Sequence, residues 1–220
     1  VSGNGSFNEA LIYFSSYNES DLNRINSLEN ESSRGNRSEL KEFGFKTNKD
    51  LGLGQNLSIK FGVDGLYRSI QPPFKLLAGN GIENEIKNSQ TVQQKELSAF
   101  ASSGYSPGKF NIQFGLRTSM FGEQLADYFS FEPRLSIIYK AGKSLSIKMG
   151  AMRNTQSVFA MSKSIQGMPA YTWLPATANL KPQSSWQTSA GLNWQKGKFN
   201  IDAEAYYKWM ENIAGNYLYP

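Results

Sequence analysis

The segment from Phe199 to Trp209 alternates between apolar and polar side chains at almost every step, and it constrains the fold more than any other feature. Its odd positions are apolar or aromatic, and its even positions are mostly polar or charged. Because successive side chains of a β-strand point to opposite faces, the segment predicts a strand with one apolar face and one wet face. Residues Trp186–Trp194 repeat the pattern, and a turn at Gln195–Lys198 joins the two segments. Aromatic residues end the apolar stripe, as expected of strands that cross a bilayer.

The composition removes several classes of function. The 220 residues contain no Cys and no His, so disulfides, thiolate chemistry and a His-based catalytic triad are excluded. We therefore expect no enzyme activity, no catalytic residue, no metal site and no cofactor. The net charge of +5 is spread along the chain without a basic block, which argues against nucleic-acid binding. A mean hydropathy of −0.48 and the absence of any long apolar run exclude transmembrane helices but not a membrane barrel, whose strands are only half apolar.

The alternation divides the whole chain into about nine candidate strands. The first two, near Phe7–Tyr17 and Glu39–Thr47, alternate least cleanly. The other seven are Leu57–Arg68, Leu97–Tyr105, Phe110–Met120, Phe129–Lys140, Leu145–Ala151, Trp186–Trp194 and Phe199–Trp209.

The connections between these strands alternate in length. The short turns are at Ser106–Gly108, Ala141–Lys143 and Lys196–Gly197, with a slightly longer turn at Asn48–Asn56. The longer connections are Asn18–Ser38, Ser69–Gln94, Gly122–Tyr128 and Asn154–Ser184. Short and long links thus fall on opposite ends of the sheet, as in outer-membrane barrels, whereas a soluble Greek-key sandwich has no reason to keep this order.

Aromatic residues at the strand ends predict two membrane-interface belts. Trp186 and Trp194 lie roughly 26 Å apart along a strand, or roughly 20 Å across a membrane when tilted by about 40°, close to the ~25 Å apolar band of such barrels. Mid-strand residues such as Phe114 and Leu192 are then predicted to face lipid, and Asn193 to face the lumen. The predicted belt residues are Tyr67, Tyr105, Phe110, Phe129, Tyr139, Trp186, Trp194, Phe199, Tyr207 and Trp209.

Five residues are candidates for ligand contact. Arg117, Glu132 and Arg134 lie on polar strand faces, and Tyr171 and Trp173 lie in the longest connection. Each group has an alternative role. The charged residues also suit a salt-bridged network that braces the wall or docks another element. The aromatic residues also suit a rigid rim packed from neighbouring loops.

The C-terminal part contains a series of distinctive short runs. They are Phe131–Ser136, Ser144–Gly150, Gly167–Pro169, Trp173–Pro175, Asn179–Gln183, Ser189–Gly191 and Glu204–Lys208, with Met210. In this order they resemble the TonB-dependent receptors of Bacteroidetes. The resemblance covers about Phe129 to Asn212, and before Phe129 it rests on the spacing of strands and loops alone.

This resemblance implies an all-β, antiparallel transmembrane barrel in the bacterial outer membrane, with about 22 strands and an N-terminal plug energised through TonB. Such receptors import siderophores, vitamin B12 or oligosaccharides. Residues 1–220 are then expected to be an internal part of the barrel, without the plug or the closing C-terminal strands. The expected partners are outer-membrane lipid, the plug, the TonB complex and a surface lipoprotein.

Two other functions remain open. One is a passive channel or structural barrel protein without a plug. The other is a soluble β-sandwich that binds carbohydrate through exposed aromatic residues.

Overall fold

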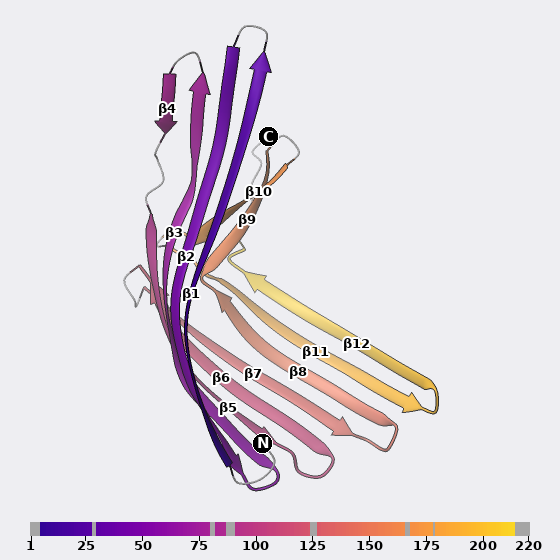
Figure 1. Cartoon of the computed structure of the whole chain (residues 1–220). Helices are drawn as coiled ribbons and strands as arrows, with labels where there is room; N and C mark the ends of the chain where they lie inside the picture. The colour runs from indigo at the N-terminus through magenta and orange to yellow at the C-terminus, as the bar shows by residue number, and fades with distance from the viewer. Residues whose placement is uncertain are drawn as a thin grey trace.

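The fold is a single long meander of antiparallel strands. The computed structural model describes residues 5–27, 30–79, 82–86, 91–123, 127–165, 168–177 and 179–213, and only the backbone at 21–27, 30–37, 72–79, 82–86, 160–165 and 168–172. The ten-stranded main sheet follows the order β1-β2-β3-β5-β6-β7-β8-β11-β12, with β4 paired to β3 (Figure 1). The nine strands on this path are β1 (Gly5–Ser27), β2 (Asn30–Leu53), β3 (Leu57–Gly79), β5 (Val92–Tyr105), β6 (Phe110–Gly122), β7 (Tyr128–Lys140), β8 (Leu145–Gln156), β11 (Gln183–Lys196) and β12 (Phe199–Glu211).

The nine meander strands predicted from alternation are thereby confirmed, and so are the tight turns between them, but the turn predicted at Asn48–Asn56 is shorter because β2 continues to Leu53. Each pair of neighbours on the path is antiparallel and consecutive apart from two inserted pieces, β4 (Ile82–Ile86) and a separate hairpin. The turns before β6 and β12 use Gly108 and Gly197 at φ values of 59° and 61°, a conformation that favours glycine. Among the described residues no helix is long and apolar enough to cross a membrane.

The first three strands are much longer than their alternation suggested. β1, β2 and β3 have 23, 24 and 23 residues. They therefore take in most of Asn18–Ser38 and the first part of Ser69–Gln94, which the sequence predicted as loops. The pairing of β1 with β2 continues without a break from Gly5↔Gly52 to Ser27↔Asn30. Backbone hydrogen bonds extend this ladder through polar sequence, which carries no alternation to signal a strand.

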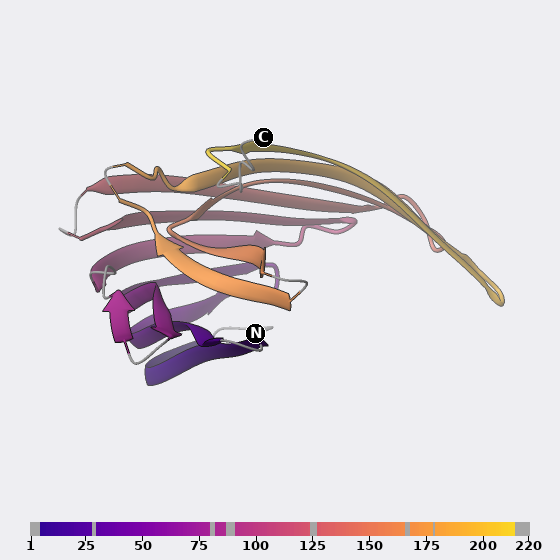
Figure 2. The same ribbon diagram turned by 90° about the horizontal axis from the view of Figure 1, so that it is seen from above.

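Cross-strand register collects the apolar side chains on one face of the sheet. Phe114 lies opposite Leu135, and Leu192 lies between Ile147 and Ala203. Phe114 and Leu192 are 51% and 43% exposed, so the described residues leave this part of the apolar face uncovered. Figure 2 shows that the sheet is curved and that the connection between β8 and β11 lies inside the curve. Side chains of the polar face contact this connection, so the polar face is concave and the apolar face is convex.

The connection between β8 and β11 forms a second, two-stranded sheet. Its strands are β9 (Val158–Ile165) and β10 (Met168–Pro175), paired from Val158↔Pro175 to Ile165↔Met168. This hairpin lies on the concave side of the main sheet, where β10 contacts β2 and β3 (Figure 2). The sequence predicted Asn154–Ser184 as one long connection without strands. In the structure its first residues belong to the end of β8, and most of the rest forms this hairpin.

Candidate functional site

The concave face carries a network of charged side chains on neighbouring strands. Arg68 of β3 is at its centre: its Nε lies 2.9 Å from Glu42 Oε2, and its Nη1 lies 3.0 Å from Glu96 Oε2. The three side chains are only 14–21% exposed. These partners come from β2 and β5, which flank β3 in the sheet. The ion pairs thus tie three adjacent strands together on the inner side.

Arg117 of β6 extends this network. Its Nη1 and Nη2 donate to the two carboxylate oxygens of Asp64 at 2.8 and 2.7 Å. Its Nη2 also donates to Ser98 Oγ at 2.8 Å and lies 3.6 Å from Glu96 Oε1. Glu96 therefore links Arg117 to Arg68. Two parallel bonds to one carboxylate fix the guanidinium plane, so most of its donors are used by the wall itself.

Glu132 and Arg134 of β7 lie beside Arg117. Glu132 is the register partner of Arg117, and its side chain is 8% exposed. Its carboxylate accepts from the backbone N of Thr155 at 3.2 Å and from Arg134 Nη2 at 3.4 Å. The Arg134 side chain, by contrast, is 54% exposed. The structure therefore brings together the predicted ligand residues Arg117, Glu132 and Arg134. The side chain of Arg134 is more exposed than those of Arg68 and Arg117.

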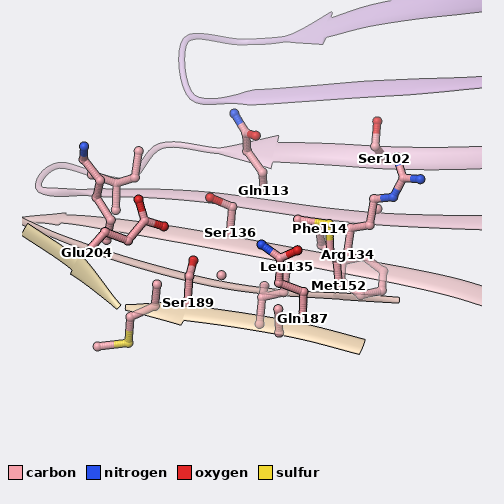
Figure 3. A pocket seen from close by; sticks show the side chains of 16 residues that line it. Ser102, Gln113, Phe114, Arg134, Leu135, Ser136, Met152, Gln187, Ser189 and Glu204 are labelled. Atoms are coloured by element: carbon pink, nitrogen blue, oxygen red, sulfur yellow. The ribbon is translucent and has the colours of Figure 1, made fainter. Parts of the chain in front are cut away.

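A hollow of 430 Å³ opens next to Arg134 on the same face (Figure 3). Its floor is made of small residues: Ser136 faces Gly150, which in turn faces Ser189. Longer polar side chains surround this floor, including Gln113, Arg134, Lys148, Gln187 and Glu204. The hollow thus offers cationic, anionic and amide groups around a shallow, open base.

Sequence reasoning missed this hollow. Its floor residues are small and lie on three strands, so no local pattern marks them. Only the registers of β7 with β8 and of β8 with β11 bring Ser136, Gly150 and Ser189 into one row.

The two aromatic candidates lie on β10, away from this row. Trp173 meets Tyr17 of β1 edge-on, with ring centroids 5.9 Å apart and an interplanar angle of 79°. Its Nε1 is buried and has no hydrogen-bond partner. Tyr171 pairs with Ser162 in the hairpin register, and its side chain lies outside the described residues. Trp173 therefore packs against Tyr17, and ligand contact by Trp173 or Tyr171 stays a prediction.

The predicted belt aromatics lie on six of the strands, and all but Tyr67, which is in the middle of β3, lie toward a strand end. Phe110 stacks on Tyr139 of the next strand at 4.7 Å, and Trp186 lies opposite Trp209. Eight of the ten are more than a third exposed: Tyr67, Tyr105, Phe110, Phe129, Trp186, Phe199, Tyr207 and Trp209. Their contact with a membrane interface stays a prediction.

Comparison with known proteins gives a consistent result. A family model described as "TonB dependent receptor-like, beta-barrel" matches residues 2–219. No curated protein matches the chain.

Solved structures of low sequence identity share its fold. They include the FrpB iron transporter from Neisseria meningitidis (TM-score 0.56, 10% identity), the siderophore receptor PirA from Pseudomonas aeruginosa (0.56, 12%) and the RagAB peptide transporter (0.53, 12%). These matches cover 90%, 90% and 94% of this chain but only 36%, 40% and 28% of theirs. The chain therefore spans well under half the length of the structures it resembles.

Proposed function

This chain belongs to the TonB dependent receptor-like β-barrel family, and from that premise we propose that it is a wall of an importer for a scarce or large ligand. Proteins of this family are receptors and transporters of the bacterial outer membrane rather than enzymes. Family membership removes the soluble carbohydrate-binding sandwich from consideration. The passive channel remains the alternative that an experiment must exclude.

One observation supports ligand contact more than any other, namely the hollow beside the exposed guanidinium of Arg134. A planar guanidinium presents several fixed donors and binds oxygen-rich groups such as carboxylates well. Gln113, Gln187 and Lys148 add further donors around the small-residue floor. We therefore propose a ligand with several exposed oxygen acceptors, a description that fits siderophores, vitamins and oligosaccharides alike.

The proposed partners follow from the family. In the parent protein we expect a plug domain inside the barrel, and the TonB complex acting on that plug. A surface lipoprotein that covers the mouth is a further proposal. Outer-membrane lipid would cover the convex apolar face, where Phe114 and Leu192 are exposed.

The test measures energised uptake by the full-length parent in cells. Radiolabelled ferric siderophores, cobalamin and oligosaccharides are offered in turn, with and without a protonophore that collapses the proton gradient. We expect accumulation of one class, and its loss with the gradient. Uptake that is equally fast without the gradient would establish the passive channel instead.

The same assay tests the hollow. Arg134→Ala should lower uptake of the accepted class because it removes the most exposed guanidinium beside the hollow. The matched control is Lys198→Ala, which removes a cation from the exposed turn before β12. Equal uptake by the two variants would reject a role for the hollow while leaving the import function itself intact.

A further inference from the structure

The β9–β10 hairpin is attached to the concave wall through the residue just before β9. Ser157, which precedes β9, is 9% exposed. Its Oγ accepts from Arg68 Nη1 at 3.3 Å and donates to Glu96 Oε2 at 3.4 Å. Its carbonyl oxygen accepts from Gln94 Nε2 at 3.1 Å. Three wall residues thus bind one residue at the base of the hairpin. We call Arg68 of β3 and Gln94 and Glu96 of β5 the Ser157 clamp.

The clamp is sheltered from water. Gln94 is 1% exposed, and its amide oxygen accepts from Arg68 Nη1 at 3.1 Å. The Gln94 amide nitrogen therefore donates to the Ser157 carbonyl oxygen in a position that water does not reach while the hairpin lies on the wall.

A small apolar core secures the same base. Phe159 of β9 and Ala176 after β10 pack with Phe121 of β6, and each is at most 2% exposed. The Tyr128 hydroxyl donates to the carbonyl oxygen of Thr177 at 2.6 Å. This apolar cluster stabilises the contact of the hairpin with the wall, because separating it would expose these side chains to water.

A third contact joins the hairpin to β1, which is separated from the clamp strands β3 and β5 by β2. Trp173 of β10 packs edge-on against Tyr17 of β1. The hairpin therefore reaches from its origin after β8 across the concave face to the first strand (Figure 2).

We propose that Arg68, Gln94 and Glu96 are positioning residues that hold the β9–β10 hairpin permanently against the inner wall. The hairpin is then a fixed inner surface of the passage, not a loop that swings outward. The proposal concerns the wall described above and so rests on the proposed barrel function, but its test does not need transport.

The test is chemical cross-linking in the full-length receptor in outer-membrane vesicles. Tyr17→Cys and Trp173→Cys are combined in a background without other cysteines, a condition this chain meets because it has none. A short bis-maleimide then joins β1 to β10. These two substitutions remove the aromatic contact, so the cross-linking rate depends on the Ser157 clamp and the apolar core.

We expect fast and complete cross-linking with the clamp intact. Arg68→Ala and Gln94→Ala should each slow it, because each removes a bond to Ser157. The matched control is Lys60→Ala on β3, the strand of Arg68, because it breaks the ion pair of Lys60 with Asp50 of β2 without touching Ser157. Ser157→Ala should also slow the reaction, and Ser157→Thr should restore it because threonine keeps the hydroxyl.

Two results would overturn the proposal. Slow or incomplete cross-linking with the clamp intact would mean that the hairpin does not stay on the wall. Equal rates in the Arg68→Ala, Gln94→Ala and Lys60→Ala variants would mean that the clamp does not position it. Heat-modifiable migration on gels shows that each variant barrel has folded, so a changed rate is not a failure of assembly. Absent uptake by the wild type would count against the proposed function alone.

Discussion

The charged side chains of the concave wall differ in how much they are exposed to water. This exposure determines how much the free energy of unfolding falls when one of them is removed. Arg117 and Asp64 have side chains 28% and 18% exposed, whereas Lys148 and Asp202 are 46% and 50% exposed. Screening by water weakens an exposed ion pair to a small net contribution. A half-buried, two-bond pair is screened less and leaves a desolvated partner when broken.

The first prediction compares these two ion pairs. Arg117→Ala should destabilise the folded barrel by roughly 1–3 kcal/mol, because Asp64 loses two bonds in a partly buried position. Lys148→Ala should have little effect. Urea titration of the receptor in detergent or lipid measures both changes in the free energy of unfolding. A double-mutant cycle with Asp64→Ala then isolates the coupling, and a coupling near zero would contradict this account.

The second prediction concerns the two faces of β11. Leu192→Arg should cost about 2–4 kcal/mol near the bilayer midplane, because it places a charge on the apolar convex face. Asn193→Arg, one residue away on the concave face, should cost much less. Folding titrations into lipid vesicles measure both values. Similar costs at the two positions would show that the faces have been assigned to the wrong sides.

The residues of the site were only partly predictable from sequence. Alternation alone put Arg117, Glu132 and Arg134 on the polar face, because it depends only on counting along one strand. It could not identify Asp64 as the partner of Arg117, which is 53 residues away in the chain. The Arg68–Ser157 bond, which joins residues 89 positions apart, was equally out of reach.

At the level of elements, the strands within the apolar band were predictable and their extensions were not. A strand that separates lipid from water must alternate, so its sequence shows it. Along the ends of β1–β3, where the sequence is mostly polar and does not alternate, the backbone ladder persists without that requirement. The β9–β10 hairpin was not predictable from sequence either, because its position depends on contacts with distant strands.

A third prediction distinguishes two glycines on the concave face. A Cβ on Gly62 of β3 would collide with the carbonyl oxygen of Thr47, whereas a Cβ on Gly150 would meet only ordinary contacts, the nearest being Ser189 Oγ at 3.4 Å. Gly62→Ala should therefore destabilise the pairing of β2 with β3, and Gly150→Ala should be tolerated. Urea midpoints of the two variants give the comparison, and equal midpoints would contradict it.

At the scale of the whole molecule, the described sheet is an open arc. β1 pairs only with β2, and β12 pairs only with β11 in this part of the chain. Each outer strand therefore leaves one row of backbone donors and acceptors without a strand partner. Such rows are not tolerated in hydrocarbon, where no water can satisfy them.

The fourth prediction follows from these edges. Residues 1–220 expressed alone should fail to form a heat-modifiable monomer in detergent and should associate through the free edges. The full-length parent, refolded in parallel, is the control. Size-exclusion chromatography with light scattering measures the mass, and a stable folded monomer of the isolated segment would contradict the prediction.

The unusual length of β2 has a consequence for the cell surface. Its 24 residues extend to roughly 80 Å at about 3.3 Å per residue, or roughly 60 Å of height at a tilt of about 40°. The apolar band takes up only about 25 Å of that height. With β1 and β3 beside it, this side of the sheet extends well beyond β5 to β8 (Figure 1). In the outer membrane it would rise among the sugar chains of lipopolysaccharide, so antibodies and phages would meet this side of the mouth first.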